Sequence, residues 1–152
     1  MIASKRIGMA GHSLGGDAAA ATMAVDKRVR AGANLDGTFH PAVALDRPFQ
    51  LMGSQSDHVP GKDHTWDEGW TKMSGWKRWL TVARTDHSSF TDLSILQRAA
   101  GMSSPDALSP QRSLELTRAY VGAFFDRHLK GRRQPLLDGP SPAGPEVAFH
   151  NP

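Results

Sequence analysis

The sequence predicts an α/β fold with a mostly parallel sheet of about four strands and flanking helices. Two observations support this prediction. Short apolar runs alternate with helical segments along most of the chain, as in strand–helix–strand units. Near the start, a short apolar run, a glycine-rich turn and an alanine-rich stretch follow one another directly. With 152 residues and 39% hydrophobic residues, the chain has the size of one domain and can form a modest core.

Each expected element follows from local composition. The predicted strands are, in chain order, Ile7–Ala10, Val29–Leu35, Pro48–Met52 and Lys77–Ala83. Alanine is the best helix former, so its high frequency after Leu14 predicts a helix that ends near Asp26. The long polar connection over residues 54–76 contains a short helix around Trp66–Met73.

The strongest helix prediction lies near the C-terminus. Ser109 supplies an N-cap, Pro110 occupies the first helical position, and Gly131 is suited to the residue just past the end. Residues 1–133 therefore form the expected domain. Residues 134–152 are rich in proline, and we expect them to form an extended tail without a core of its own.

The glycine-rich turn has the pattern of a nucleophile. Gly11-His12-Ser13-Leu14-Gly15 matches G-x-S-x-G between a strand and a helix, the nucleophile elbow of α/β-hydrolases. We expect glycine at positions 11 and 15 because side chains there would collide with the strand and the helix. The turn would hold the Ser13 hydroxyl clear of the sheet and direct the Leu14 N–H toward a developing oxyanion.

A serine nucleophile needs a base, and His87 is the best candidate because it directly follows the last predicted parallel strand. The other histidines fit less well. His12 lies inside the elbow and is expected to face away from the serine. The rest precede the last strand or lie on the terminal helix or in the tail: His40, His58, His64, His128 and His150.

Two aspartates are candidates for the acid that orients the base. Asp36 closes the second predicted strand, and Asp57 follows the third. Both positions lie at the edge of the sheet that carries the elbow, so topology does not separate them. For the aspartate that is not the acid, the alternative is a turn residue that caps its own backbone.

Several segments together resemble a known family. Gly11–Gly16, Asn34–Gly37, Pro48–Gly53, His87–Asp92 and the closing Phe124–Leu129 are similar to bacterial α/β-hydrolases related to platelet-activating factor acetylhydrolase. The resemblance covers nearly the whole chain. It implies a serine esterase or lipase-like enzyme that cleaves short-chain or phospholipid-type acyl esters without a cofactor.

The resemblance also bears on the acid and on the extent of the fold. The family places its acid directly after the strand that follows the nucleophile helix, which maps onto Asp36, whereas cutinase-like relatives place it at the position of Asp57. Only twelve residues precede Ser13. We therefore expect the C-terminal half of the fold, without the loop that normally supplies the second oxyanion donor.

The same residues are consistent with two other functions. One is a catalytically impaired half-domain that acts as a structural or assembling fragment, and the other is a serine peptidase on the same scaffold. An exposed edge beside the elbow strand would favour self-association, so we expect a homo-oligomer.

Composition argues against other classes. The absence of cysteine excludes disulfides and thiol chemistry, and Asp57, His58, Asp63 and His64 match no metal-site pattern, so we expect no metal. The basic residues Arg127, Lys130, Arg132 and Arg133 suit a helix C-terminus better than nucleic acid. No apolar run is long enough to span a membrane. As it stands, the sequence has no signal peptide, which suggests a cytoplasmic location, or a secreted one if a longer N-terminus exists.

The tryptophans have two interpretations. Tryptophan is more often a packing residue than a substrate contact. However, Trp66 and Trp70 lie four residues apart on a predicted helix near the mouth of the site, where they could form a wall for an acyl chain.

Overall fold

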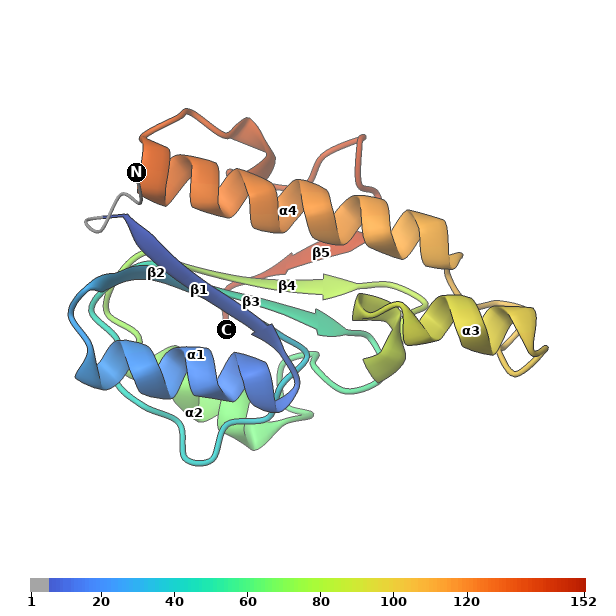
Figure 1. Ribbon diagram of the computed structural model, residues 1–152, viewed down its shortest axis with the longest axis horizontal. Coiled ribbons are helices and arrows are strands. Elements are labelled where there is room, and N and C mark those ends of the chain that lie inside the picture. The colour runs from blue at the N-terminus through green and yellow to red at the C-terminus, as the bar shows by residue number, and fades with distance from the viewer. Residues whose placement is uncertain (1–5) are drawn as a thin grey trace.

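The computed structural model describes residues 6–152 (Figure 1). Strands and helices alternate as expected through the first half of the chain. The elements are β1 (Ile7–His12), α1 (Leu14–Val25), β2 (Val29–Leu35), β3 (Phe49–Ser54), α2 (His64–Lys72), β4 (Lys77–Val82), the 3₁₀ turn η1 (His87–Phe90), α3 (Leu93–Ala99), α4 (Pro110–Lys130), the 3₁₀ turn η2 (Pro135–Leu137) and β5 (Val147–His150).

The sheet has five strands in the spatial order β1-β2-β3-β4-β5. The first four pair in parallel, and β5 pairs antiparallel with β4. Because strands β1 to β4 all point the same way, the loops that follow them emerge on the same side of the sheet, at the carboxyl ends of the strands. Ser13, Asp36, His58 and His87 lie on these loops or at their first residues.

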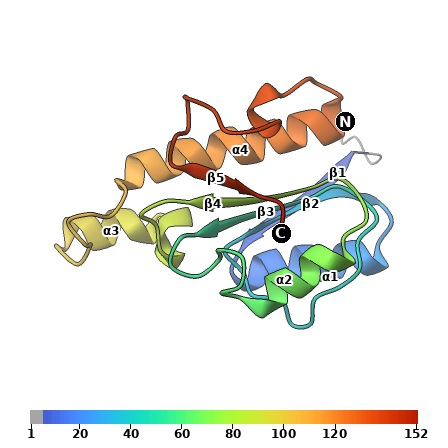
Figure 2. The ribbon, with the colours of Figure 1, turned by 180° about the vertical axis from the view of Figure 1, so that it is seen from behind.

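Helices cover both faces of the sheet (Figures 1 and 2). Helices α1 and α2 lie against one face, and α4 crosses the other. Strand β3 shows why both faces need cover, because Phe49 and Leu51 pack with α1 and α2 while Met52 packs with α4. The expectation of a mostly parallel α/β sheet with flanking helices is confirmed.

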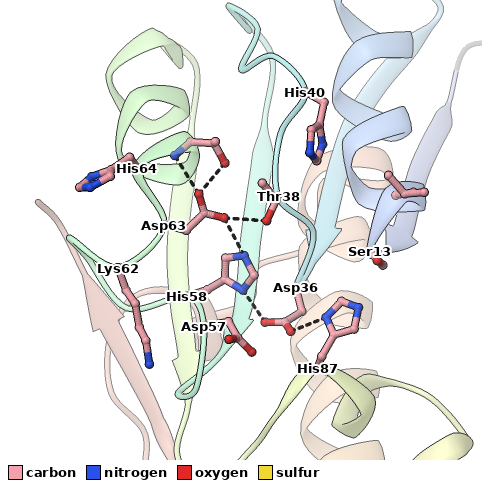
Figure 3. Close-up of a pocket in the computed structure, with 12 residues that line it drawn as sticks. Ser13, Asp36, Thr38, His40, Asp57, His58, Lys62, Asp63, His64 and His87 are labelled. Atoms are coloured by element: carbon pink, nitrogen blue, oxygen red, sulfur yellow. Dashed lines mark hydrogen bonds and ion pairs between the residues drawn. The ribbon is translucent and has the colours of Figure 1, made fainter.

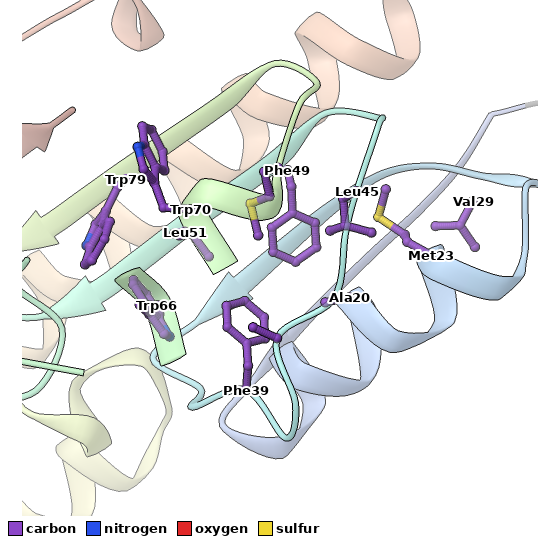
Figure 4. Close-up of a cluster of buried hydrophobic side chains, with 12 residues drawn as sticks. Ala20, Met23, Val29, Phe39, Leu45, Phe49, Leu51, Trp66, Trp70 and Trp79 are labelled. Atoms are coloured by element: carbon purple, nitrogen blue, oxygen red, sulfur yellow. The ribbon is translucent and has the colours of Figure 1, made fainter. Parts of the chain in front are cut away.

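Aromatic side chains dominate the layer between the sheet and α2 (Figure 4). Trp66 and Trp79 are fully buried, and their rings meet edge to face with centroids 5.4 Å apart. Trp70 is only 6% exposed and packs against Trp79. These side chains form the core, so the alternative of an acyl-chain wall built from Trp66 and Trp70 is wrong.

Both predicted ends of helix α4 are confirmed. The Ser109 hydroxyl accepts a hydrogen bond from the Arg112 N–H at 3.2 Å, and Gly131 adopts the left-handed conformation with φ of 67°. The basic residues at this end form ion pairs on the protein itself, as Lys130 contacts Asp126 and Arg127 contacts Asp138.

The prediction of an extended tail after residue 133 needs correction. Its last part forms strand β5, and the side chains of Leu137 and Val147 are buried in the core beneath α4. The many prolines concealed this strand because proline disfavours sheet interiors. Val147–His150 contains no proline, and β5 lies at the sheet edge, where a short strand is sufficient.

Candidate active site

The serine lies in a strained turn. Ser13 has φ of 58° and ψ of −128°, which is unusual for a residue other than glycine. A Cβ at Gly11 would lie 2.2 Å from the Gly15 backbone, and one at Gly16 would lie 2.0 Å from Asn34 Oδ1, whereas one at Gly15 would meet no atom within 4 Å. The expected need for glycine therefore holds at position 11 but not at position 15. The second position at which a side chain would collide with its surroundings is Gly16, not Gly15.

Leu14 is the first residue of helix α1. Backbone N–H groups in the first helical turn have no partner within the helix. The Leu14 side chain is 71% exposed, and the residue lines the same cavity as Ser13 and His87. The Leu14 N–H is thus available beside the serine, at the positive end of the helix dipole.

Asp36 occupies the turn that follows β2. Its φ of 56° is also in the left-handed region, and the Asn34 side chain stabilises the turn by accepting from the Gly37 N–H and donating to the Gly37 carbonyl. The Asp36 residue is 1% exposed. The turn therefore places a carboxylate inside the protein at the end of the sheet.

His87 begins the 3₁₀ turn after β4, whose N-cap is Asp86. Its Nδ1 donates to Asp36 Oδ2 at 2.8 Å, and about half of its side chain is exposed toward the cavity. In residues 6–152 the Ser13 hydroxyl makes no hydrogen bond, and neither does His87 Nε2. Figure 3 shows Ser13 and His87 beside the same pocket.

The charge state of Asp36 follows from its partners. Burial raises the pKa of Asp36, but hydrogen bonds from His58 and from the Ser54 N–H, with a further one from His87, outweigh this effect and lower the pKa to about 2. Asp36 is therefore ionised at neutral pH and can accept hydrogen bonds on both oxygens.

His58 is the residue that sequence reasoning missed. It is 3% exposed, and its Nδ1 donates to Asp36 Oδ1 at 2.6 Å while its Nε2 lies 3.1 Å from Asp63 Oδ2 (Figure 3). Its only sequence signal is its place next to Asp57, in the loop after the third strand. That position gave no reason to prefer it to the other histidines.

His12 contacts the loop that carries His87. Its Nε2 donates to the His87 carbonyl at 2.8 Å, and the two rings lie 4.4 Å apart between centroids. Burial lowers the pKa of His12. The residue therefore supports the backbone of the loop that carries His87.

The second candidate acid, Asp57, lies elsewhere in the site. Its carboxylate accepts from the hydroxyls of Ser54 and Ser56, at 3.2 Å for Ser54 and at 2.5 Å for Ser56. No hydrogen bond joins Asp57 to His87 in the described part of the chain.

These loops surround a cavity of about 810 Å³. Beyond Ser13, Asp36, His58 and His87, its walls include the side chains of Thr38, His40, Asp57, Lys62, Asp63 and His64. Between Arg6 and Pro152, no group of three or more histidine or acidic side chains is arranged to hold a metal ion. No helix of residues 6–152 is long and apolar enough to span a bilayer.

Comparisons with known proteins identify relatives of this chain. A probable 1-alkyl-2-acetylglycerophosphocholine esterase of Arthroderma benhamiae is 34% identical over 95% of the chain. The solved structure of a ferulic acid esterase from Streptomyces cinnamoneus superposes with a TM-score of 0.88 and 42% identity over 99% of the chain. Over nearly its whole length, the chain is therefore similar to parts of two esterases. No protein-family model matches it.

The resemblance to the platelet-activating factor acetylhydrolase-like family is thereby confirmed. The match covers 43% of the Arthroderma esterase and 48% of the Streptomyces esterase. The chain thus spans about half the length of the relatives that it matches.

Proposed function

We propose that this esterase homologue is a serine hydrolase that cleaves carboxylic esters through Ser13, His87 and Asp36. The main support is the 2.8 Å hydrogen bond between His87 Nδ1 and the buried Asp36 carboxylate, beside the strained turn of Ser13. A base oriented by an acid next to a serine is the arrangement that acyl transfer requires.

The mechanism follows from these positions. His87 Nε2 takes the proton from the Ser13 hydroxyl as the oxygen attacks the ester carbonyl, and Asp36 stabilises the imidazolium that forms. The Leu14 N–H donates to the oxyanion of the tetrahedral intermediate. His87 then protonates the leaving alcohol, and the same base activates a water molecule that releases the acid from the acyl-enzyme. The absence of a Ser13–His87 hydrogen bond is compatible with this mechanism, because such bonds often tighten only when substrate binds.

The relatives indicate the substrate class. One is named for an acetyl ester of a glycerophospholipid and the other for esters of ferulic acid. Both substrates contain a carboxylic ester. We propose the same bond for this chain, with short-chain or phospholipid-type acyl groups as the preferred substrates.

Hydrolysis of p-nitrophenyl acetate tests the function. The wild-type chain is expected to release p-nitrophenol, and Ser13→Ala and His87→Ala should each abolish most of the release, because members of a triad act as a unit. Equal rates for wild type and Ser13→Ala would contradict the assignment of Ser13. A wild-type chain without activity would instead favour a structural fragment.

We also propose that the 152-residue chain self-associates through strand β1. In residues 6–152, β1 pairs only with β2, so one side of its backbone is unpaired. An unpaired strand edge favours pairing with a second copy.

A further inference from the structure

We propose that His58 is a positioning residue for the acid, forming with Asp63 a second His–Asp pair that binds Asp36 from the side opposite His87. This inference rests on the proposed function. Asp36 uses its two oxygens for two different histidines, Oδ2 for His87 at 2.8 Å and Oδ1 for His58 at 2.6 Å. The Ser54 N–H donates to the same Oδ1, so His58 and this backbone group together fix the rotation of the carboxylate and keep Oδ2 directed toward His87.

Both ring nitrogens of His58 face carboxylate oxygens. Nδ1 contacts Asp36, and Nε2 lies 3.1 Å from Asp63 Oδ2. Although burial raises the pKa of Asp63, hydrogen bonds from Thr65 and Thr38 outweigh that effect and lower it, so Asp63 is ionised like Asp36. An imidazole ring donates through both nitrogens only as the imidazolium. The geometry therefore calls for a positively charged His58 between two carboxylates.

The surroundings of His58 hold the ring in this position. Its ring stacks on Trp66 with centroids 4.1 Å apart, and its carbonyl accepts from Trp79 Nε1 at 3.0 Å and from the Thr81 hydroxyl at 2.7 Å. A Cβ at Gly53 would lie 2.3 Å from His58 Cβ, so glycine at that position leaves room for the histidine. A side chain whose ring packs on Trp66 and whose backbone is fixed by two hydrogen bonds is suited to orient another group.

Asp63 is fixed in turn. It is the N-cap of helix α2, where its Oδ1 accepts from the Thr65 N–H at 2.8 Å and its Oδ2 accepts from the Thr38 hydroxyl at 2.9 Å. A continuous series of hydrogen bonds therefore runs from the start of α2 through His58 and Asp36 to the base. Such networks define a single arrangement of polar groups in a buried site.

The positive charge of His58 has a consequence for the reaction. Asp36 lies between His58 and His87 (Figure 3), so the charge of His58 offsets part of the negative charge by which Asp36 stabilises the imidazolium of His87. Removing the charge of His58 should therefore keep His87 protonated up to a higher pH. Besides Asp36 and Asp63, the charged and titratable residues around His58 are Asp57 next to it in the chain and, on the walls of the same cavity, Lys62, His40, His64 and His87.

Two substitutions separate the two contacts of His58. In His58→Asn the amide nitrogen takes the place of Nδ1, which keeps the donor to Asp36 and removes the charge. In His58→Gln the amide nitrogen reaches the place of Nε2, which keeps the contact with Asp63 and removes the donor to Asp36. For p-nitrophenyl acetate, we expect kcat/KM to fall less than tenfold in the first variant and about 10–100-fold in the second.

The pH dependence gives a readout that a structural role would not change. In both variants the midpoint of the rise of kcat/KM with pH should move upward by about one pH unit. His128→Asn is the matched control, because His128 is packed between Trp76 and Phe124 beside the other end of β4, away from the cavity. It should lower the melting temperature and leave the midpoint unchanged.

Histidine ring ¹⁵N spectra of the wild-type protein test the bridge without reference to activity. We expect one histidine, absent from the spectrum of His58→Asn, to carry protons on both nitrogens at pH 7. A neutral tautomer for this histidine, or equal rates and midpoints in His58→Gln and wild type, would overturn the proposal. If the wild-type protein shows no Ser13-dependent turnover, only the proposed function is contradicted. The ¹⁵N spectrum would still show whether His58 bridges Asp36 and Asp63.

Discussion

Gly16 lies directly against the side chain of Asn34, close enough that a Cβ at position 16 would lie 2.0 Å from Asn34 Oδ1. Gly16 belongs to the helix that follows the nucleophile, and the Asn34 amide closes the turn that carries Asp36. This contact adds to the hydrogen bond from the Ser13 N–H to the Leu35 carbonyl at 2.9 Å, so the serine turn and the acid turn are packed against each other, and we expect a change at Gly16 or Asn34 to affect both.

Gly16→Ala should damage the protein, whereas Gly15→Ala should not. The methyl group at position 16 would displace the Asn34 amide and overpack a buried contact, at about 1–3 kcal/mol. For a domain of this size, each kcal/mol lowers the melting temperature by roughly 2–4 °C. Position 15 has open space, so alanine there is expected to leave the melting temperature unchanged or raised.

Differential scanning fluorimetry and ester hydrolysis measure both variants. A Gly16→Ala protein as stable and active as Gly15→Ala would show that the helix and the acid turn are not coupled in this way.

The two candidate acids can be separated by substitution. Asp36→Asn should lower kcat on the order of 10⁴-fold, the magnitude known for loss of the orienting aspartate in a serine protease. Asp57→Asn should cost about tenfold or less, because the Asp57 carboxylate accepts from Ser54 and Ser56 rather than from His87. The opposite ranking in steady-state kinetics would assign the acid to Asp57, as in cutinase-like enzymes.

His128 should make the fold sensitive to mild acid. Burial, with a smaller contribution from the charge of Arg127, lowers the pKa of His128 from 6.5 to about 4. Between these values the unfolded chain binds a proton that the folded chain does not, so the free energy of unfolding should fall as the pH drops from 6.5 to 4. In His128→Phe, which keeps an aromatic ring against Trp76, this decrease should be smaller. Urea unfolding at pH 7 and pH 4.5 measures the difference, and equal decreases in both proteins would count against this explanation.

The purified chain should form a dimer or a larger oligomer. A second copy paired with β1 would satisfy its unpaired backbone groups, and each Å² of apolar surface that it covers would add about 25 cal/mol. Light scattering coupled to size-exclusion chromatography should therefore give a mass that is a multiple of 16.5 kDa. A single 16.5 kDa species at micromolar concentration, with a cooperative melt, would contradict self-association.

Local sequence signals predicted those parts of the fold that depend on neighbouring residues. Val29–Leu35 has the predicted bounds, and helix α4 begins and ends at its predicted caps, Ser109 and Gly131. Strand β5 was missed because its stability comes from pairing with β4, a contact between segments far apart in the chain.

The residues of the candidate site likewise fall into two groups, those marked by local sequence signals and those whose role depends on distant parts of the chain. Ser13 is marked by its motif, and His87 by its position after a strand. Nothing near His58 in the sequence indicates its role, because that role depends on Asp36 from one loop and on the N-cap of α2. Gly16 is a similar case, since glycine is needed in helix α1 at this position because of Asn34 on strand β2.

Labelling with a fluorophosphonate tests the central claim most directly, because the probe requires an activated serine and no knowledge of the substrate. Peptide mass spectrometry of the wild-type chain should find one adduct, on Ser13. The adduct should be absent from Ser13→Ala and should form far more slowly in His87→Ala. A folded wild-type protein that takes up no probe, or that carries the adduct on a different serine, would contradict the assignment of Ser13, His87 and Asp36 as a catalytic unit.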